Sequence, residues 1–199
     1  MKRRLSKSGI GSKFVSLFYH FLALALVACL TFVYMSLSQT AVSTFPEGAV
    51  FEVGFSPKGR SLNIILSAIK KANTSILVAA YTFTSKPISI ALLEAHKRGV
   101  RVQVVADDKS NKSQYSAVTF LTNQGVPVRR NGKYAIFHHK FMVFDGRHVQ
   151  TGSFNYSAAA VDRNAENVIL MMNVPEIADF YTREWQRLWN ESKEATPNY

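Results

Sequence analysis

Residues 138–155 read His-His-Lys-Phe-Met-Val-Phe-Asp-Gly-Arg-His-Val-Gln-Thr-Gly-Ser-Phe-Asn. Two runs rich in apolar residues, Phe137–Phe144 and His148–Thr151, lie on either side of the pair Asp145-Gly146. An Asp-Gly pair between two such runs is a strong hairpin signal. The sequence therefore predicts two paired strands joined by a tight turn.

Alternation along these strands brings polar side chains together. Residues i and i+2 of a strand share a face, so His138 and Lys140 are expected to project together and His139 to the opposite face. Ser153 and Asn155 form a second pair with this spacing, on the partner strand or just beyond it. An imidazole, an ammonium, a hydroxyl and an amide directed at one spot suit a phosphate group. We therefore expect a phosphate site here.

Strand and helix signals alternate along the rest of the chain. Apolar residues at helical spacing predict a helix at Ser61–Lys71, with Ser61 as the expected N-cap. A second helix is expected to start at Pro87, after the cap Ser85, and to run to Arg98. Such alternation predicts an α/β fold, a mixed sheet flanked by helices. The other expected helices span 113–124 and 175–190, and the other expected strands span 49–55, 75–81, 100–106, 126–129 and 167–172.

The N-terminal part of the chain has a different composition. Residues 1–13 are a basic n-region, and residues 14–37 carry no charge and are long enough to span a bilayer. We interpret 14–37 as a hydrophobic helix, either a cleaved signal peptide or a membrane anchor, and 38–49 as a linker to a domain at 50–199. A buried core helix is the alternative, which the five flanking charges disfavour. The domain is expected to be exported, periplasmic or anchored outside the cytoplasm.

The net charge of +11 divides between these parts. Of the 24 basic residues, five precede residue 14, so 19 basic and 13 acidic residues remain and leave +6 for the rest of the chain. A basic domain favours an anionic partner such as nucleic acid or a membrane surface. The single cysteine, Cys29, excludes an internal disulfide framework and any zinc finger built on several cysteines.

The hairpin and its extension follow the pattern H-x-K-x4-D-x6-G-S-x-N. This pattern resembles the signature of the phospholipase D superfamily, and six specified positions make chance agreement very improbable. The positions that match are His138, Lys140, Asp145, Gly152, Ser153 and Asn155. Lys140, Ser153 and Asn155 would contact the phosphate, and Gly152 would let the backbone come close to it. In the family the position of Asp145 looks structural and orients the loop.

The resemblance implies a mechanism. One histidine attacks phosphorus and forms a phosphohistidine, while a second protonates the leaving oxygen and then activates water; histidine suits both tasks because its pKa lies near neutrality. His138 supplies one of these groups, and Glu166 is the carboxylate expected to orient the nucleophile. The sequence has no cluster of acidic residues and histidines with metal-ligand spacing, so we expect neither a metal ion nor another cofactor.

The mechanism requires two histidines, but the chain carries the H-x-K motif once. A twofold homodimer would bring His138 and Lys140 of both copies into one site. Overall the chain resembles the small exported plasmid-type endonuclease branch of the superfamily, over residues 53–189. His139 departs from that pattern, which leads us to expect a smaller or acidic residue between the histidine and the lysine.

The substrate is open at this point. A nonspecific nuclease would use basic residues to follow the nucleic-acid backbone, although such residues can equally form a solvated face; the candidates are Lys109, Lys112, Arg129, Arg130 and Lys133. A phospholipase D that hydrolyses phosphatidyl head groups at a membrane could use the same phosphate site. A catalytically inert anion-binding dimer is a third class, which the intact motif disfavours.

Overall fold

The computed structural model describes residues 10–38 and 44–198. The chain divides into two units, Met1–Thr44 and Phe45–Tyr199, and each is described by itself. The first unit contains one helix, α1 (Ile10–Ser38), so the expected hydrophobic helix is present. In the described part of the chain, no helix has the combined length and apolar character needed to cross a membrane. Most of the basic n-region and part of the linker lie outside the described residues, and the signal or anchor role of 14–37 stays a prediction.

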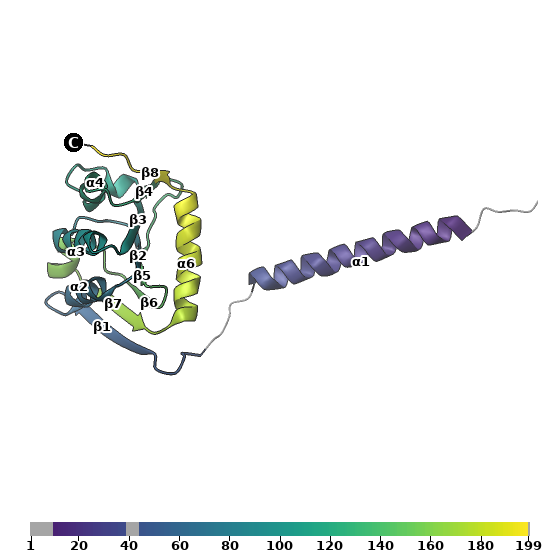
Figure 1. Ribbon diagram of the computed structural model, residues 1–199, viewed down its shortest axis with the longest axis horizontal. Helices are drawn as coiled ribbons and strands as arrows, with labels where there is room; N and C mark the ends of the chain where they lie inside the picture. The colour runs from purple at the N-terminus through teal and green to yellow at the C-terminus, as the bar shows by residue number, and fades with distance from the viewer. Residues whose placement is uncertain (1–9, 39–43, 199) are drawn as a thin grey trace, which may run out of the picture. The chain divides into compact units, whose positions relative to one another are not determined.

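The second unit is built on one mixed sheet of eight strands (Figure 1), which confirms the α/β prediction. The strand order is β1-β7-β6-β5-β2-β3-β4-β8. The strands are β1 (Val50–Ser56), β2 (Ser75–Ala80), β3 (Arg101–Asp107), β4 (Val128–Asn131), β5 (Lys140–Phe144), β6 (His148–Gly152), β7 (Glu166–Met172) and β8 (Lys193–Glu194).

Connection length explains the strand directions. β2, β3 and β4 run parallel because helical crossovers join them, whereas β5 and β6 form the predicted antiparallel hairpin. β7 then pairs antiparallel with both β6 and β1. As a result β1, β2, β3, β4 and β6 end at the same edge of the sheet at which β5 and β7 begin. We call this edge the site edge.

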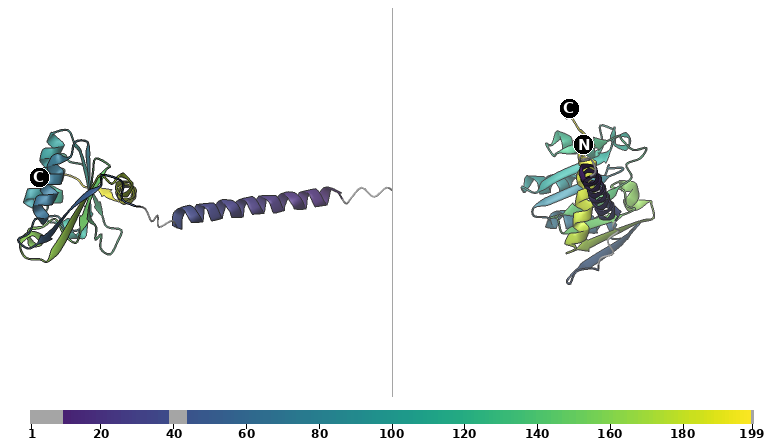
Figure 2. Two further views of the ribbon diagram at one scale, coloured as in Figure 1. Left: turned by 90° about the horizontal axis from the view of Figure 1, so that it is seen from below. Right: turned by 90° about the vertical axis from the view of Figure 1, so that its right-hand side faces the viewer.

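Helices cover both faces of the sheet (Figures 1 and 2). One layer consists of α2 (Ser61–Lys71), α3 (Lys86–Lys97) and α4 (Ala117–Asn123), and the other of α6 (Pro175–Asn190). The short elements η1 (Lys109–Asn111) and α5 (Ala158–Asp162) lie in connections at the site edge.

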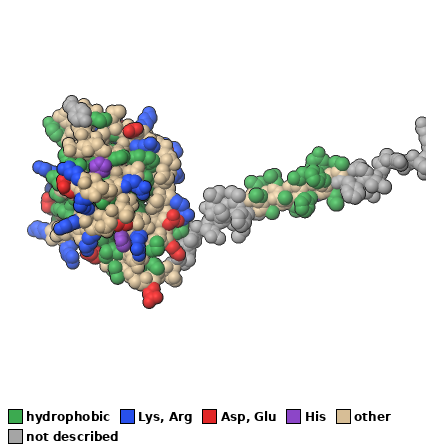
Figure 3. All heavy atoms as spheres, in the orientation of Figure 1, with side chains coloured by type: hydrophobic (Ala, Val, Ile, Leu, Met, Phe, Trp, Pro, Cys, Tyr) green, Lys and Arg blue, Asp and Glu red, His purple; other side chains and the backbone are tan. Residues whose placement is uncertain are grey.

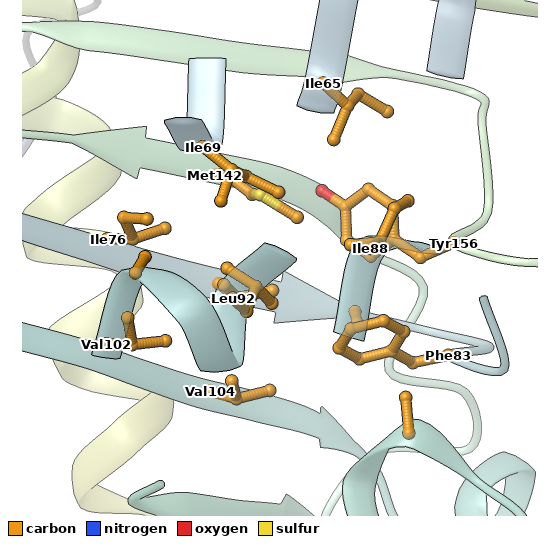
Figure 4. Packing of buried hydrophobic residues seen from close by; sticks show 14 of the residues in the cluster. Ile65, Ile69, Ile76, Phe83, Ile88, Leu92, Val102, Val104, Met142 and Tyr156 are labelled. Atoms are coloured by element: carbon orange, nitrogen blue, oxygen red, sulfur yellow. The ribbon is translucent and has the colours of Figure 1, made fainter. Parts of the chain in front are cut away.

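Each layer has its own hydrophobic core. Figure 4 shows the larger one, in which Ile65 and Ile69 of α2 and Leu92 of α3 pack with strand residues such as Met142. The second core lies under α6, where the fully buried Trp185 donates an indole hydrogen bond to the Val78 carbonyl oxygen at 2.9 Å. The apolar stripes read from the sequence therefore point inward on both faces.

Several local predictions were wrong. Ser61 is the first residue of α2 and not its cap: Arg60 holds the N-cap position without a side-chain hydrogen bond. The Ser61 hydroxyl is buried and has no partner among the described residues, and the backbone at Ser61 packs closely against Gly54 of β1. α4 begins at Ala117, not at 113, because Ser116 is its cap and accepts a hydrogen bond from the Thr119 N–H at 3.2 Å.

The strand that carries the motif also starts later than predicted. β5 begins at Lys140, so His138 lies in the segment before the strand and not within it. The two-residue strand β8 was not predicted; it pairs only with Arg129 and Arg130 of β4. A strand of this length carries no periodicity from which it could be inferred.

Candidate active site

The motif residues His138 and Lys140 lie together at the site edge, as the spacing predicted. Lys140 opens β5, is 7% exposed, and its Nζ donates a hydrogen bond to the carbonyl oxygen of His138 at 2.9 Å. His138 itself is exposed. The His138 imidazole is therefore accessible to a substrate, whereas the Lys140 ammonium is buried beside the backbone of His138.

His139 points toward the other face, again as predicted. Its ring lies between those of Phe137 and Phe141, at centroid distances of 5.4 and 5.5 Å, and its Nε2 is 3.8 Å from Glu184 of α6. Burial lowers the pKa of His139 more than Glu184 raises it. His139 is thus part of the packing between β5 and α6.

Ser153 and Glu166 form the second part of the site. The Ser153 hydroxyl donates to Glu166 Oε2 at 2.5 Å and accepts a hydrogen bond from the Asn167 N–H at 3.1 Å. Asn164 donates to the other carboxylate oxygen at 2.9 Å. In the described chain the hydrogen bonds of Glu166 therefore go to these two residues and not to His138, so the expected carboxylate–imidazole pair is not formed within one copy.

Glu166 acts on Lys140 by charge. Burial lowers the pKa of the Lys140 ammonium, and the negative charge of Glu166 opposes this effect without cancelling it. A buried cation with few partners gains from an anion placed beside it. The pair is therefore poised to receive a phosphodiester, whose negative charge would stabilise the protonated lysine further.

Asn155 lies just beyond β6, where the sequence placed it. Its Oδ1 is buried and has no hydrogen-bond partner among the described residues. A buried acceptor without a partner costs free energy. We therefore expect a substrate or a second chain to complete its hydrogen bonding. The short helix expected near Ser157 is α5, and Ser157 is its cap.

Gly152 shows why the motif needs glycine, but for a reason other than the predicted one. Its φ is +151°, and a Cβ at this position would lie 2.2 Å from the carbonyl oxygen of Asn167. The close approach in the structure is therefore to the backbone of β7, and an approach to the phosphate stays a prediction. Gly152 allows β6 to bring Ser153 next to Glu166.

The structure does not bring Asp145 to the site. It lies in the hairpin turn at the opposite end of β5, where its carboxylate accepts hydrogen bonds from the backbone N–H groups of Asn73, Thr74 and Ser75 at 2.8–3.2 Å. Partial burial would raise the pKa of Asp145, but these hydrogen bonds outweigh burial and hold the pKa below its usual value. The residue joins the hairpin to the start of β2, in keeping with the structural role that the resemblance implied.

The predicted backbone-binding residues divide into two groups. Lys112, Arg130 and Lys133 line a cleft of about 830 Å³ that opens at the site edge, beyond the ends of β3 and β4. The Nζ of Lys133 forms an ion pair with Oε2 of Glu191 at 2.6 Å, and Glu191 also lines the cleft. Arg129, in contrast, stacks on Trp189 at 4.4 Å and serves the packing of α6.

Lys109 is an exposed residue of η1 and lies in sequence between Asp108 and Lys112, which both line this cleft. Figure 3 shows Lys and Arg side chains spread over the viewed face of the domain. In the part of the chain that the structure describes, no group of three or more His, Cys, Asp or Glu side chains is placed to hold a metal ion.

Sequence reasoning missed one side chain at this site. Tyr81 directly follows β2, and its ring contacts the imidazole of His138 with a centroid distance of 4.8 Å and an interplanar angle of 60°. The same ring lies 5.2 Å from Lys140 Nζ. An aromatic residue at the end of an apolar strand was the available signal, but nothing in the sequence pairs that strand with β5.

Comparison with known proteins agrees with this fold. Residues 65–189 match the family model described as "Cardiolipin synthase, PLD-like domain". The chain therefore belongs to the phospholipase D superfamily of phosphodiesterases. The phospholipase D family member Nuc from Salmonella typhimurium is 38% identical, with a TM-score of 0.73 over 74% of this chain and 99% of that chain.

Two curated relatives are similar over the same region. The mitochondrial cardiolipin hydrolase of Xenopus laevis is 37% identical over 135 residues, which are 68% of this chain and 64% of the relative. The phospholipase D of Rickettsia conorii is 36% identical over 131 residues, which are 66% of this chain and 65% of the relative. The chain thus spans a little under two thirds of the length of these relatives.

Proposed function

We propose that the protein is a metal-independent phosphodiesterase that cleaves nucleic acid nonspecifically and works as a homodimer. His138 of one copy attacks phosphorus, a bond from imidazole nitrogen to phosphorus forms, and the bond to the leaving oxygen breaks. His138 of the other copy gives that oxygen a proton. It then takes a proton from water, whose oxygen displaces the imidazole and releases the phosphate product.

The observation that carries this proposal is the arrangement of His138 and Lys140. An accessible imidazole lies directly beside a buried ammonium, with Ser153 and Asn155 just beyond the neighbouring strand. The ammonium offers a charged donor to phosphoryl oxygens, and Ser153 and Asn155 add neutral hydrogen-bonding groups. This set serves a phosphodiester of any origin.

The single motif supports a dimer, and so does one surface of the domain. Phe51, Val53 and Phe55 of β1 are 69%, 45% and 65% exposed. Because Gly54 faces α2, these three side chains lie on the α6 face of the sheet, which α6 covers over β6, β5, β2 and β3. We call them the β1 apolar stripe. A second copy that packs on this stripe would bury apolar area and lie next to the site.

The stripe is continuous with the site. Phe55 pairs with Asn167, and Asn167 donates from its backbone and its side chain to Ser153. A partner seated on the stripe therefore reaches the site edge, where its own His138 is needed. This continuity supports a second copy of the chain as the occupant.

The charge distribution supports nucleic acid as the substrate. The cleft with Lys112, Arg130 and Lys133 opens at the site edge, so a long anionic strand that passes His138 can extend toward it and would replace Asp108 and Glu191 as the partners of Lys112 and Lys133. We further propose that the protein belongs to the exported plasmid-type branch. The names of the curated relatives favour the alternative, a phospholipase D that hydrolyses phospholipid head groups.

One experiment separates the two substrates. The full-length protein is incubated with EDTA and either labelled single-stranded DNA or cardiolipin vesicles. We expect DNA cleavage that declines steeply with salt, because phosphate contacts release counterions. Lipid hydrolysis without DNA cleavage would favour the alternative, and no turnover of either substrate or of bis-nitrophenyl phosphate would contradict both.

The matched variants are His138→Ala and His96→Ala. The first removes the nucleophile and should lower kcat by about 10³-fold or more. The second removes a histidine of α3, away from the site edge, and should leave kcat unchanged. If His138→Ala keeps most of the activity, the site is wrong.

A further inference from the structure

Tyr81 is placed at the active site by the pairing of β2 with β5. In this antiparallel pair Ala80 is opposite Lys140. Tyr81 is the next residue after β2, and its ring lies beside both motif residues: it forms a T-shaped pair with the imidazole of His138, and the Lys140 ammonium lies over its face. One side chain thus contacts the two reacting groups of the same copy.

The backbone of Tyr81 is held by a buried asparagine. Asn111 is 0% exposed. Its Nδ2 donates to the carbonyl oxygens of Tyr81 at 2.6 Å and of Asp107 at 2.8 Å, and its Oδ1 accepts a hydrogen bond from the Phe83 N–H at 2.9 Å. The loop after β2 is therefore fixed on both sides of Tyr81.

The same strand end fixes the segment before His138. The Asp107 carboxylate, which is 3% exposed, accepts hydrogen bonds from the Phe137 N–H at 3.0 Å and the Ser110 N–H at 2.7 Å. Asp107, at the end of β3, is therefore linked to both loops: through Asn111 to the backbone of Tyr81, and directly to the backbone of Phe137 next to His138. The ring and the imidazole meet because both loops are anchored to one point.

Lys140 needs such a neighbour. Among the described residues its Nζ makes one hydrogen bond, to the carbonyl oxygen of His138. A buried ammonium with so few donor–acceptor contacts is stabilised by the face of an aromatic ring. The T-shaped contact with the Tyr81 ring favours one orientation of the His138 imidazole, because aromatic rings prefer defined relative orientations.

We propose that Tyr81 is a positioning residue of the phosphodiesterase site, whose ring orients the His138 imidazole and holds the Lys140 ammonium in place. The ring is the active part, because no hydrogen bond of the phenolic oxygen is found in the described residues. The proposal rests on the phosphodiester chemistry proposed above, but it is independent of whether DNA or lipid is the natural substrate.

The test compares Tyr81→Phe with Tyr81→Leu, using bis-nitrophenyl phosphate and the full-length protein. The phenylalanine variant keeps the ring, so we expect it to retain wild-type kcat. The leucine variant keeps much of the volume but loses the ring, so kcat should fall by about 10- to 100-fold. Tyr115→Leu is the matched control, because Tyr115 is 85% exposed and its hydrogen bond goes to Ser113, not to a motif residue.

The pH dependence of kcat separates positioning from a purely structural role, because a structural role would leave the shape of the profile unchanged. Loss of the ring disfavours protonated Lys140, so the alkaline limb of kcat should move to lower pH in Tyr81→Leu only. The titratable groups near Lys140 are Glu166 on β7, whose charge acts on it, and His138, whose carbonyl oxygen accepts its hydrogen bond; His139 is adjacent in sequence but points to the other face, and all three are unchanged in this variant.

Proton NMR of the His138 ring tests the contact without turnover, with His138→Ala used for assignment. We expect the ring-proton resonances to shift in Tyr81→Leu and to stay in place in Tyr81→Phe. Equal loss of activity in both variants would overturn the proposal, because the hydroxyl would then be the functional group. Unchanged activity and resonances in Tyr81→Leu would also overturn it. An inactive wild type would instead contradict the proposed function.

Discussion

At the scale of single residues, the two ends of β5 have separate tasks. Lys140 at the first end is buried beside His138 and faces the site. Asp145, beyond the other end, has a φ of +53° and binds three consecutive backbone N–H groups at the start of β2. One sequence motif thus contains a lysine at the candidate active site and an aspartate that anchors the hairpin.

Asp145→Asn should therefore lower stability and leave kcat within about twofold of wild type. Because the folded-state pKa of Asp145 is below its unfolded value, its contribution is present above an unfolded pKa of about 4 and is lost as the pH falls through the folded pKa. Asparagine keeps the left-handed turn but weakens the hydrogen bonds, at a cost of about 1–2 kcal/mol at pH 7.

Urea unfolding at pH 7 and at pH 3 measures this effect. The difference between wild type and variant should shrink at the lower pH. A large loss of kcat with unchanged stability would instead place Asp145 in the catalytic machinery.

At the scale of elements, the junction of β6 and β7 builds half of the site. The register pairs Gly152 with Val168, and the missing side chain of Gly152 lets the backbone of Asn167 come close. The hydroxyl of Ser153 is thereby delivered to Glu166 at the start of β7. The position of the carboxylate beside Lys140 depends on this contact between strands.

Gly152→Ala should separate these strands. A Cβ that meets a backbone oxygen at 2.2 Å forces the backbone to move, and we expect a loss of about 2–3 kcal/mol together with reduced kcat. Gly99→Ala is the control: Gly99 has a φ of +89° but open space around it, so only the backbone preference is lost, at about 1 kcal/mol. Thermal unfolding measures both variants, and equal effects would refute the steric explanation.

The elements differ in how well the sequence predicts them. α6 was predicted with its observed bounds because five apolar residues repeat at helical spacing. α3 was predicted to within one residue at each end because a serine cap and a proline mark its start. The start of α4 was misjudged because Ser113 and Ser116 both suit a cap, and tertiary contacts select Ser116. The role of Tyr81 could not be predicted, because it arises from the pairing of β2 with β5 and from Asn111, partners that local patterns do not reveal.

At the scale of the whole molecule, the described helices leave one strand of the sheet, β1, open on one face. The sheet is covered by three helices on one side, whereas on the other α6 leaves β1 uncovered, with the β1 apolar stripe exposed. The chain also has one H-x-K motif. Under the proposed homodimer the two observations are related, because a second copy seated on the stripe would supply the second H-x-K motif.

Phe51→Glu should convert the dimer to a monomer. Phe51 pairs with Met171 at the end of β1 away from the site, so the variant introduces a charge into the stripe without touching a catalytic group. Burying that charge in an interface should weaken association by about 100-fold or more, and kcat should fall with the dimer. Sedimentation measures the oligomeric state.

Ile90→Glu is the control for this variant. Ile90 is 42% exposed on α3, in the helix layer on the opposite face of the sheet, so its replacement should leave both dimer and activity intact. A fully active wild-type monomer would contradict the shared site. A Phe51→Glu dimer with normal kcat would show that the copies meet elsewhere, and loss of vesicle binding alone would identify the stripe as a membrane contact.

The pairing of β1 with β7 has a consequence for biosynthesis. β1 ends at Ser56, whereas β7 begins only at Glu166, and β1 has no other partner in the sheet. While the chain is being made, β1 therefore leaves the ribosome long before its only neighbour exists. A nascent chain with an unpaired apolar strand is open to aggregation and binds chaperones. The sheet can take up β1 only after the residues of β7 have been made, so about 110 residues of chain must be synthesised between the two partners.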